Sequence, residues 1–171
     1  MQNVLGVMQG RLLPKYNQRF QAHPVGYWEE EFYIAKDLGL DCIEFILDAN
    51  DFEKNPLVYD NGINEIEAIM TKTDVRVLSI CADYFMKYPF HKLSESEIDR
   101  NIEIIEKLII KSKKIGIRDI VMPCVDESRF INQIEKDKFI HAISRCIELF
   151  EKNDINLSIE SDLKPNELIK L

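Results

Sequence analysis

Five short runs of β-branched and other apolar residues alternate with longer helical patterns, and this alternation constrains the fold more than any other feature of the sequence. The runs span residues 4–9, 41–47, 75–82, 118–124 and 155–160. Each interval between successive runs has room for a strand, a helix and two loops. Regular alternation of this kind predicts a parallel α/β sheet.

The intervals carry helical spacing together with helix start and stop signals. Apolar residues recur at helical spacing within 28–38, 63–70, 98–109 and 135–152. Ser94 and Glu97 predict a capping box at the start of the third helix, and Gly39 and Gly116 predict left-handed ends for the first and third. Pro165 stands where a further helical turn would begin.

Composition bounds the class of protein. A hydrophobic content of 46% in 171 residues predicts one globular domain spanning 1–171. Asp and Glu exceed Lys and Arg by 30 to 22, and the resulting charge of −8 disfavours nucleic acid and anionic membranes as partners. The longest apolar runs are far too short for a membrane helix, and the amino terminus has no signal-peptide pattern, so we expect a cytoplasmic protein.

The cysteines predict reduced thiols rather than a disulfide framework or a zinc site. Cys42, Cys81, Cys124 and Cys146 are widely separated and form no Cys-x-x-Cys pair. Free cysteine behaves mostly as a small buried apolar residue.

Two architectures fit five strands with intervening helices. One is a complete five-stranded doubly wound sheet, which the length favours, and the other is the first five βα units of an eight-unit (β/α)8 barrel of the TIM type. Polar residues within the strands favour the barrel. Glu44 shares a strand face with Cys42 and Ile46, and a carboxylate there is costly if a helix covers it. The strand at 155–160 likewise places Asn156, Ser158 and Glu160 on one face.

Candidate ligand-binding side chains follow the strand ends, where both architectures place their sites. Gln9, Glu44 and Asp83 lie at or near the ends of the first three strands. Arg11 begins a long loop and offers a bidentate fork for a phosphate or carboxylate group. The alternative for Arg11 is an exposed loop residue paired with a nearby acid. The Walker, Gly-x-Gly-x-x-Gly, Gly-x-Ser-x-Gly and His-Glu-x-x-His motifs are absent from the sequence.

Four segments, taken in order, resemble the sugar phosphate isomerase/epimerase family of xylose isomerase-like TIM barrels. They are Leu-Gly-Val-Met-Gln-Gly-Arg-Leu at 5–12, Gly-Leu-Asp-Cys-Ile-Glu at 39–44, Ser-Ile-Cys-Ala-Asp-Tyr at 79–84 and Leu-Ser-Ile-Glu-Ser-Asp-Leu at 157–163. The resemblance implies isomerisation or epimerisation of a small sugar or sugar phosphate, with a proton moved at a carbon next to a carbonyl. It also implies a divalent metal ion, Mn, Mg, Zn or Co.

On this resemblance Glu160 matches the family glutamate that ends the fifth strand, and it is implied to be both a catalytic residue and a metal ligand. Gln9, Arg11, Glu44 and Asp83 are then expected to bind substrate. The family's other ligands come from strands six to eight, which have no counterpart here, so we expect an incomplete barrel that does not by itself bind the metal. The alternative is a non-catalytic half-barrel that acts as a binding or assembly module and forms a homo-oligomer through its open sheet edges. DNA repair, which the same fold supports, conflicts with the charge.

Overall fold

The five predicted strands form one parallel sheet in sequence order. The structure, a computed structural model, describes residues 4–171. The strands pair in the order β1-β2-β3-β4-β5, and every pairing is parallel. Their bounds are Gly6–Met8, Cys42–Ile46, Arg76–Cys81, Asp119–Cys124 and Asn156–Ser161 for β1 to β5. Each strand falls within a predicted run or extends one residue beyond it, which confirms the predicted order.

Helices connect the strands and account for the regular spacing. Within residues 4–171 the α-helices are α1 (Glu30–Asp37), α2 (Gly62–Thr73), α3 (Tyr84–Lys87), α4 (Glu95–Lys114), α5 (Gln133–Ser144), α6 (Ile147–Asn153) and α7 (Pro165–Leu168). Short 3-10 turns at Tyr16–Gln18, Phe52–Lys54, Phe90–Lys92 and Asp126–Ser128 lie in the loops that follow the first four strands. Sequence patterning did not predict α3 or these turns.

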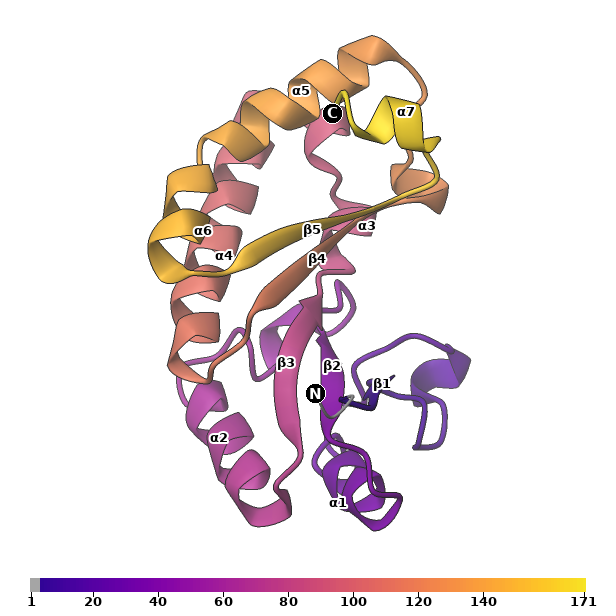
Figure 1. Cartoon of the computed structure of the whole chain (residues 1–171), viewed down its shortest axis with the longest axis vertical. Coiled ribbons are helices and arrows are strands. Elements are labelled where there is room, and N and C mark those ends of the chain that lie inside the picture. Colours follow the sequence, from indigo (N-terminus) through magenta and orange to yellow (C-terminus); the bar gives the residue numbers. More distant parts are fainter. Residues whose placement is uncertain (1–3) are drawn as a thin grey trace.

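Helices cover only one face of the sheet, and this decides between the two predicted architectures. Figure 1 shows α2, α4, α5 and α6 along one side of a curved sheet. Ile43, Phe45 and Ile120, which point toward these helices, are fully buried, whereas Glu44 and Ser158 on the opposite face are only partly buried. A doubly wound sheet has helices on both faces, so the arrangement is part of a barrel wall. We call the uncovered concave side the inner face.

The predicted helix ends are confirmed at most positions. Glu97 and Ser94 form the capping box of α4, in which the Ser94 backbone N–H donates to the Glu97 carboxylate at 2.9 Å. Gly39 and Gly116 follow α1 and α4 with φ of 72° and 78°, in the left-handed region that favours glycine. Pro165 is the first residue of α7.

The prediction of one continuous fourth helix over 135–152 was wrong. Two helices, α5 and α6, occupy this segment and are separated at Arg145 and Cys146. Cys146, with φ of −117° and ψ of 0°, is the N-cap of α6, and its Sγ donates to the Ile143 carbonyl at 3.2 Å. The break changes the direction of the chain, so that both halves follow the curved sheet (Figure 1).

All four cysteines are free, as predicted, and three of them are buried. Within residues 4–171, no helix combines the length and the apolar character needed to cross a membrane.

Candidate functional site

The inner face of the sheet carries polar side chains because alternate residues of each strand point to it. Glu44 on β2 accepts a hydrogen bond from the hydroxyl of Ser79 on β3 at 2.6 Å. Ser158 and Asn156 on β5 both donate to Asp119 on β4, at 3.3 and 3.0 Å. On this face, side-chain hydrogen bonds thus join β2 to β3 and β4 to β5. Such a surface suits a ligand rich in hydroxyl groups.

Asp83, directly after β3, is a partly buried carboxyl group with a raised pKa. Its oxygens accept hydrogen bonds from the Gln21 side-chain amide at 2.8 Å and from the Cys81 thiol at 3.0 Å. Burial raises the pKa of Asp83, the two hydrogen bonds oppose that rise, and the charges of Asp48 and Glu44 add to it. Asp83 therefore holds its proton more readily than an ordinary aspartate.

Cys81 shows that several acids face one region. Burial raises the pKa of this thiol, and the negative charges of Asp83, Glu44 and Glu160 raise it further. The thiol consequently stays protonated and donates to Asp83. Glu44 on β2, Asp83 directly after β3 and Glu160 on β5 thus each lie near enough to Cys81 for their charge to raise the pKa of its thiol.

A cavity of about 470 Å³, which we call the mouth cavity, opens where the loops leave the carboxyl ends of the strands. Asp48 and Arg19 form an ion pair on its wall, with Nη1 and Oδ2 2.8 Å apart. Its lining residues come from the loops after β1, β2, β3 and β4 and are Arg19, Gln21, Asp48, Ala49, Asn50, Asp83, Met86, Lys87, Asp126 and Glu127. Acids outnumber bases among them, so the cavity favours hydroxyl donors or cations over a free anion.

Glu31 of α1 fixes the long loop that follows β1. This carboxylate is completely buried and accepts hydrogen bonds from the backbone N–H groups of Gly10 at 2.7 Å and Leu12 at 3.0 Å. Burial raises the pKa of Glu31, while these hydrogen bonds lower it. The loop anchored in this way contributes Arg19 and Gln21 to the mouth cavity.

The predicted substrate residues Gln9 and Arg11 do not line the mouth cavity. Gln9 is fully buried, and its Oε1 accepts a hydrogen bond from the Ile46 N–H at 3.0 Å and lies 3.2 Å from Nδ1 of His23. Arg11 is exposed, with its guanidinium 6.0 Å from the centre of the Phe20 ring. Gln9 therefore joins β2 to the loop after β1, and Arg11 lies on the outer surface of that loop.

Glu160 lies near the carboxyl end of β5, and its side chain is exposed. The negative charge of Glu160 acts on a buried group, the thiol of Cys124. Burial raises the pKa of this thiol, and the charge of Glu160 adds to the rise, which brings the pKa to about 12. Among residues 4–171 its carboxylate has neither a hydrogen-bond nor an ion-pair partner. Glu160 is thus an available carboxylate beside the acids of the inner face.

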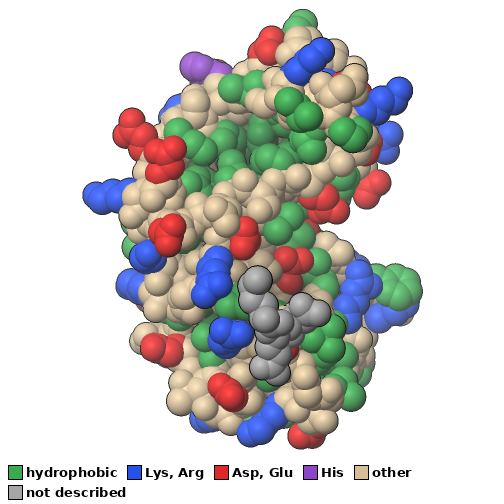
Figure 2. Space-filling model, in the orientation of Figure 1, with side chains coloured by type: hydrophobic (Ala, Val, Ile, Leu, Met, Phe, Trp, Pro, Cys, Tyr) green, Lys and Arg blue, Asp and Glu red, His purple; other side chains and the backbone are tan. Residues whose placement is uncertain are grey.

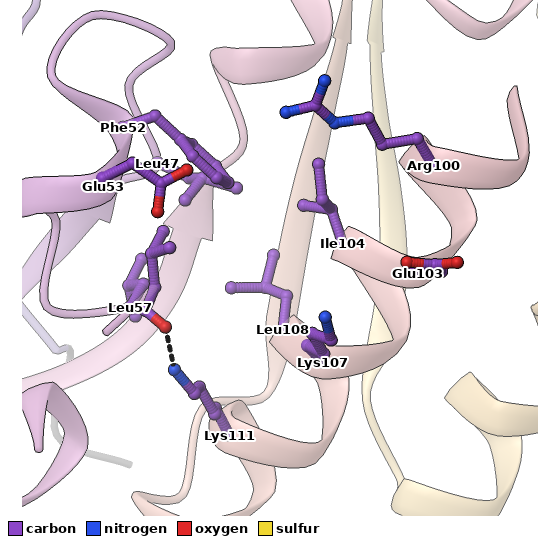
Figure 3. A pocket seen from close by; sticks show the side chains of 11 residues that line it. Leu47, Phe52, Glu53, Leu57, Arg100, Glu103, Ile104, Lys107, Leu108 and Lys111 are labelled. Atoms are coloured by element: carbon purple, nitrogen blue, oxygen red, sulfur yellow. Dashed lines mark hydrogen bonds between the residues drawn. The ribbon is translucent and has the colours of Figure 1, made fainter. Parts of the chain in front are cut away.

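A second cavity lies outside the barrel wall, between the loop after β2 and helix α4. Figure 3 shows Lys111 of α4 reaching across it to the backbone, where Nζ donates to the Val58 and Tyr59 carbonyls. Its volume is about 310 Å³, with Leu47, Leu57 and Leu108 among the lining residues. This cavity lies on the helix-covered side of the sheet, against α4, rather than at the mouth of the barrel, so we assign no part of the candidate site to it.

Sequence reasoning did not select Arg19, Gln21 or Ser79 as site residues. Arg19 and Gln21 lie within a loop that has no periodicity, and only its folded path brings them to Asp48 and Asp83. The alternation of β3 offered one signal, because Ser79 and Cys81 share a strand face two residues apart. A register shift in the pairing of β2 with β3 at Ile43 and Glu44 places Ser79 opposite Glu44.

Comparisons with known proteins agree with the barrel geometry. Residues 32–165 match the family described as xylose isomerase-like TIM barrel. A probable L-ribulose-5-phosphate 3-epimerase of Mycoplasma pneumoniae is 24% identical, the match covering 78% of this chain and 44% of that protein. A putative L-ribulose-5-phosphate 3-epimerase of Escherichia coli is 25% identical, covering 78% of this chain and 47% of that protein. The chain spans about half the length of these curated relatives.

Solved structures share the fold at low sequence identity. D-psicose 3-epimerase, solved in the presence of D-fructose, superimposes with a TM-score of 0.64 at 13% identity, covering 92% of this chain and 52% of that one. The IOLI protein with a binding zinc atom gives a TM-score of 0.63 at 15% identity, covering 93% and 51%. Both matches show the same arrangement of strands and helices over about half of the longer chain.

Proposed function

This chain belongs to the xylose isomerase-like TIM barrel family, and from that premise we propose that it forms the β1 to β5 wall of a metal-dependent sugar isomerase or epimerase in the cytoplasm. The proposed substrate is a small sugar or sugar phosphate. Support comes from the relatives, which are named as epimerases of L-ribulose 5-phosphate and D-psicose. The proposed domain spans 1–171 and represents the first five units of the barrel.

The single observation that carries the proposal is the position of Glu160 on the same side of the sheet as Glu44 and Asp83. Isomerisation and epimerisation of sugars both begin by removing a proton from a carbon next to a carbonyl. Isomerisation returns a proton to the neighbouring carbon, and epimerisation returns a proton to the opposite face of the same carbon. An exposed carboxylate without a partner among residues 4–171 is free to accept that proton. We therefore assign the proton transfer to Glu160.

The other inner-face side chains would hold the substrate while the proton moves. Glu44 accepts hydrogen bonds, and Asp83, with its raised pKa, is suited to contact a hydroxyl group as acceptor or donor. Gln9 would act indirectly by fixing the loop after β1. Arg11 remains our prediction for an anionic substrate group, although Arg19 is the arginine that lines the mouth cavity.

The side chains of residues 4–171 do not complete a metal site. No three His, Cys, Asp or Glu side chains in this part of the chain are grouped so that they could hold a metal ion. Glu160 would supply one carboxylate, and a site of about four ligands needs donors other than those described here. The identity of the metal, whether Mn, Mg, Zn or Co, stays open, and the proton transfer proposed above is assigned to the carboxylate alone.

The test is the pair of variants Glu160→Gln and Asp162→Asn. In a full-length protein that contains the complete barrel, Glu160→Gln keeps the side-chain volume but removes the base, so turnover of a ketose or ketose phosphate should fall by at least ~10²-fold, as should exchange of the substrate's carbon-bound hydrogen with D2O. Asp162, an exposed acid two residues further on, serves as the matched control and should retain near wild-type activity. Unchanged exchange in Glu160→Gln would remove Glu160 from the mechanism.

A second candidate function is a non-catalytic assembly module, and the open edges of the sheet favour it. β1 pairs only with β2, and β5 pairs only with β4, among the described strands. Exposed strand edges promote association with further strands. If purified chain shows no hydrogen exchange with any ketose tested yet assembles into a defined oligomer, this second function is supported over the first.

A further inference from the structure

Two neighbouring cavities beside α4 share part of their walls. One is the cavity of about 310 Å³ outside the barrel wall, which we call the outer cavity, and the other, of about 210 Å³, is lined in part by Tyr84 and Tyr88. Phe52, Glu53 and Arg100 line both. All lining residues of the two cavities lie between positions 47 and 111, so neither cavity involves β1, β5 or an edge of the sheet. By contrast, the hydrophobic hollow in Figure 2 adjoins β5, where the next unit of the longer barrel proposed above would pack.

The shared wall carries one acid and one base, and neither has an ion-pair partner among residues 4–171. Glu53 lies in the 3-10 turn after β2, and Figure 3 shows Arg100 of α4 reaching toward the loop that carries this turn. The amino group of Lys111 already donates to two backbone carbonyls. The remaining charged lining residues of the outer cavity, Glu103 and Lys107, are exposed and opposite in sign. A ligand with one positive and one negative group would therefore pair with both Glu53 and Arg100.

A buried hydroxyl group lies near the same two charges. Tyr84 is 6% exposed, and its hydroxyl makes no hydrogen bond to another group within residues 4–171. Burial raises the pKa of Tyr84, the positive charge of Arg100 opposes that rise, and the negative charge of Glu53 adds to it, so both charges lie near the phenol. Buried polar groups are normally hydrogen-bonded. The Tyr84 hydroxyl is thus an available donor beside Arg100.

Aliphatic side chains form the rest of the outer cavity's wall. Leu47, Leu57 and Leu108 line it and are each at most 2% exposed, and Figure 3 shows Ile104 projecting from α4 next to Leu108. Small-molecule sites combine an apolar lining with a few placed polar groups, and their volumes are about 300–1,000 Å³. The outer cavity is at the lower end of that range, so it suits a small molecule with a short aliphatic side chain.

We propose that the outer cavity and the wall that it shares bind a free α-amino acid with a branched aliphatic side chain. The carboxylate of the amino acid accepts hydrogen bonds from the Arg100 guanidinium and the Tyr84 hydroxyl, and its ammonium group pairs with Glu53. Its side chain packs against Leu57 and Leu108. Glu53 would repel a purely anionic ligand, and Arg100 would repel a purely cationic one. Binding here is independent of the proton transfer assigned to the inner face.

The first test is isothermal titration calorimetry of the full-length protein that contains this chain, with L-leucine as the probe. Leucine should bind at one site per chain. Leucinamide lacks the carboxylate, 4-methylpentanoate lacks the ammonium group, and glycine lacks the side chain, so each should bind at least about tenfold more weakly than leucine. Absence of leucine binding at millimolar concentration, or equal binding of leucine and the three analogues, would overturn the proposal.

Substitutions at the two charged residues should separate the two ends of the ligand. Arg100→Gln should weaken leucine binding at least about tenfold but change leucinamide binding little, because leucinamide has no carboxylate. Glu53→Gln should weaken leucine binding by a similar factor but should not weaken binding of 4-methylpentanoate, which has no ammonium group. Both positions are exposed, so both variants should fold.

Lys113→Gln is the matched control for the charge changes. Lys113 is an exposed residue of the same helix that lines neither cavity, so this variant should bind leucine as wild type does. Tyr84→Phe keeps the buried ring but removes the hydroxyl, and it should weaken leucine binding without affecting glycine-free analogues that lack a carboxylate, such as leucinamide. Wild-type leucine affinity in either Arg100→Gln or Glu53→Gln would mean that leucine binds elsewhere, and the proposal would then be wrong.

Discussion

His23 is a buried titratable residue whose protonation should change the free energy of unfolding of the whole protein. Its side chain is 1% exposed and lies against Phe45, with ring centres 5.4 Å apart. Burial lowers the pKa of His23 to about 4, although the charge of Asp48 partly opposes this shift. The folded protein therefore keeps His23 neutral at a pH where the unfolded chain, with an ordinary histidine pKa of about 6.5, binds a proton.

The sign of the resulting pH dependence follows from that difference. His23 contributes stability that is present above about pH 6.5 and is lost as the pH falls toward 4, and the loss by pH 5 is on the order of 2 kcal/mol. Urea unfolding at pH 7.5 and pH 5 measures it. His23→Asn should be less stable than wild type at both pH values, but its free energy of unfolding should fall less between pH 7.5 and pH 5. His141→Asn, at an exposed position, should lose as much free energy of unfolding between the two pH values as wild type does. An equal loss in His23→Asn would contradict the assignment.

Single residues also mark the limit of what the sequence could reveal about the site. Glu44 and Asp83 could be proposed because strand alternation and strand ends fix where such side chains point. Arg19 could not be separated from Arg11, since both are arginines in one loop without periodicity. Their difference arises from contacts far apart in sequence, such as the 2.8 Å ion pair of Arg19 with Asp48.

At the scale of elements, helix α2 begins with a glycine for reasons of close packing. A Cβ placed on Gly62 would lie 2.5 Å from the Cα and from the carbonyl carbon of Pro56, and closer still to its carbonyl oxygen. Backbone atoms at such a distance cannot move aside as a flexible side chain can. The start of α2 is therefore locked against the loop after β2.

Gly62→Ala should destabilise the protein despite the higher helix propensity of alanine. Overpacking against Pro56 should lower the free energy of unfolding by about 1–3 kcal/mol. The higher helix propensity of alanine should offset about 1 kcal/mol of this loss. Chemical denaturation gives the value. Glu67→Ala, at an exposed position of the same helix, should change stability by no more than about 0.5 kcal/mol. A Gly62→Ala variant as stable as wild type would show that Pro56 can move away.

Most elements were predictable from the sequence because periodicity and caps reflect local physics. The α4 capping box and the positive φ of Gly39 and Gly116 are of this kind. The division between α5 and α6 was not, because the apolar spacing continues unbroken through Arg145 and Cys146. A helix that must bend around a curved sheet breaks at a point set by tertiary packing, which a one-dimensional pattern does not contain.

For the whole molecule, the central feature is that helices cover one face of the sheet and leave the other open. Length alone favoured a doubly wound sheet, and only the polar residues within β2 and β5 indicated a barrel wall. Those residues were informative because burying Glu44 beneath a helix would cost several kcal/mol. Barrel curvature itself follows from the packing of all five strands, so it could be inferred from the sequence only through this indirect signal.

The coverage of one sheet face by helices should affect how fast each of the four cysteines reacts. Cys42 shares the inner face with Glu44 and is partly exposed, whereas Cys81, Cys124 and Cys146 are each at most 2% exposed. Burial raises the pKa of Cys42, so iodoacetamide should react with it slowly at neutral pH and faster near about pH 9. Mass spectrometry of the native protein should find one modified thiol, none in Cys42→Ser, and all four after unfolding in urea. Labelling of Cys124 or Cys146 as fast as Cys42 would mean that the helices do not cover the outer face, and the barrel wall described here would be wrong.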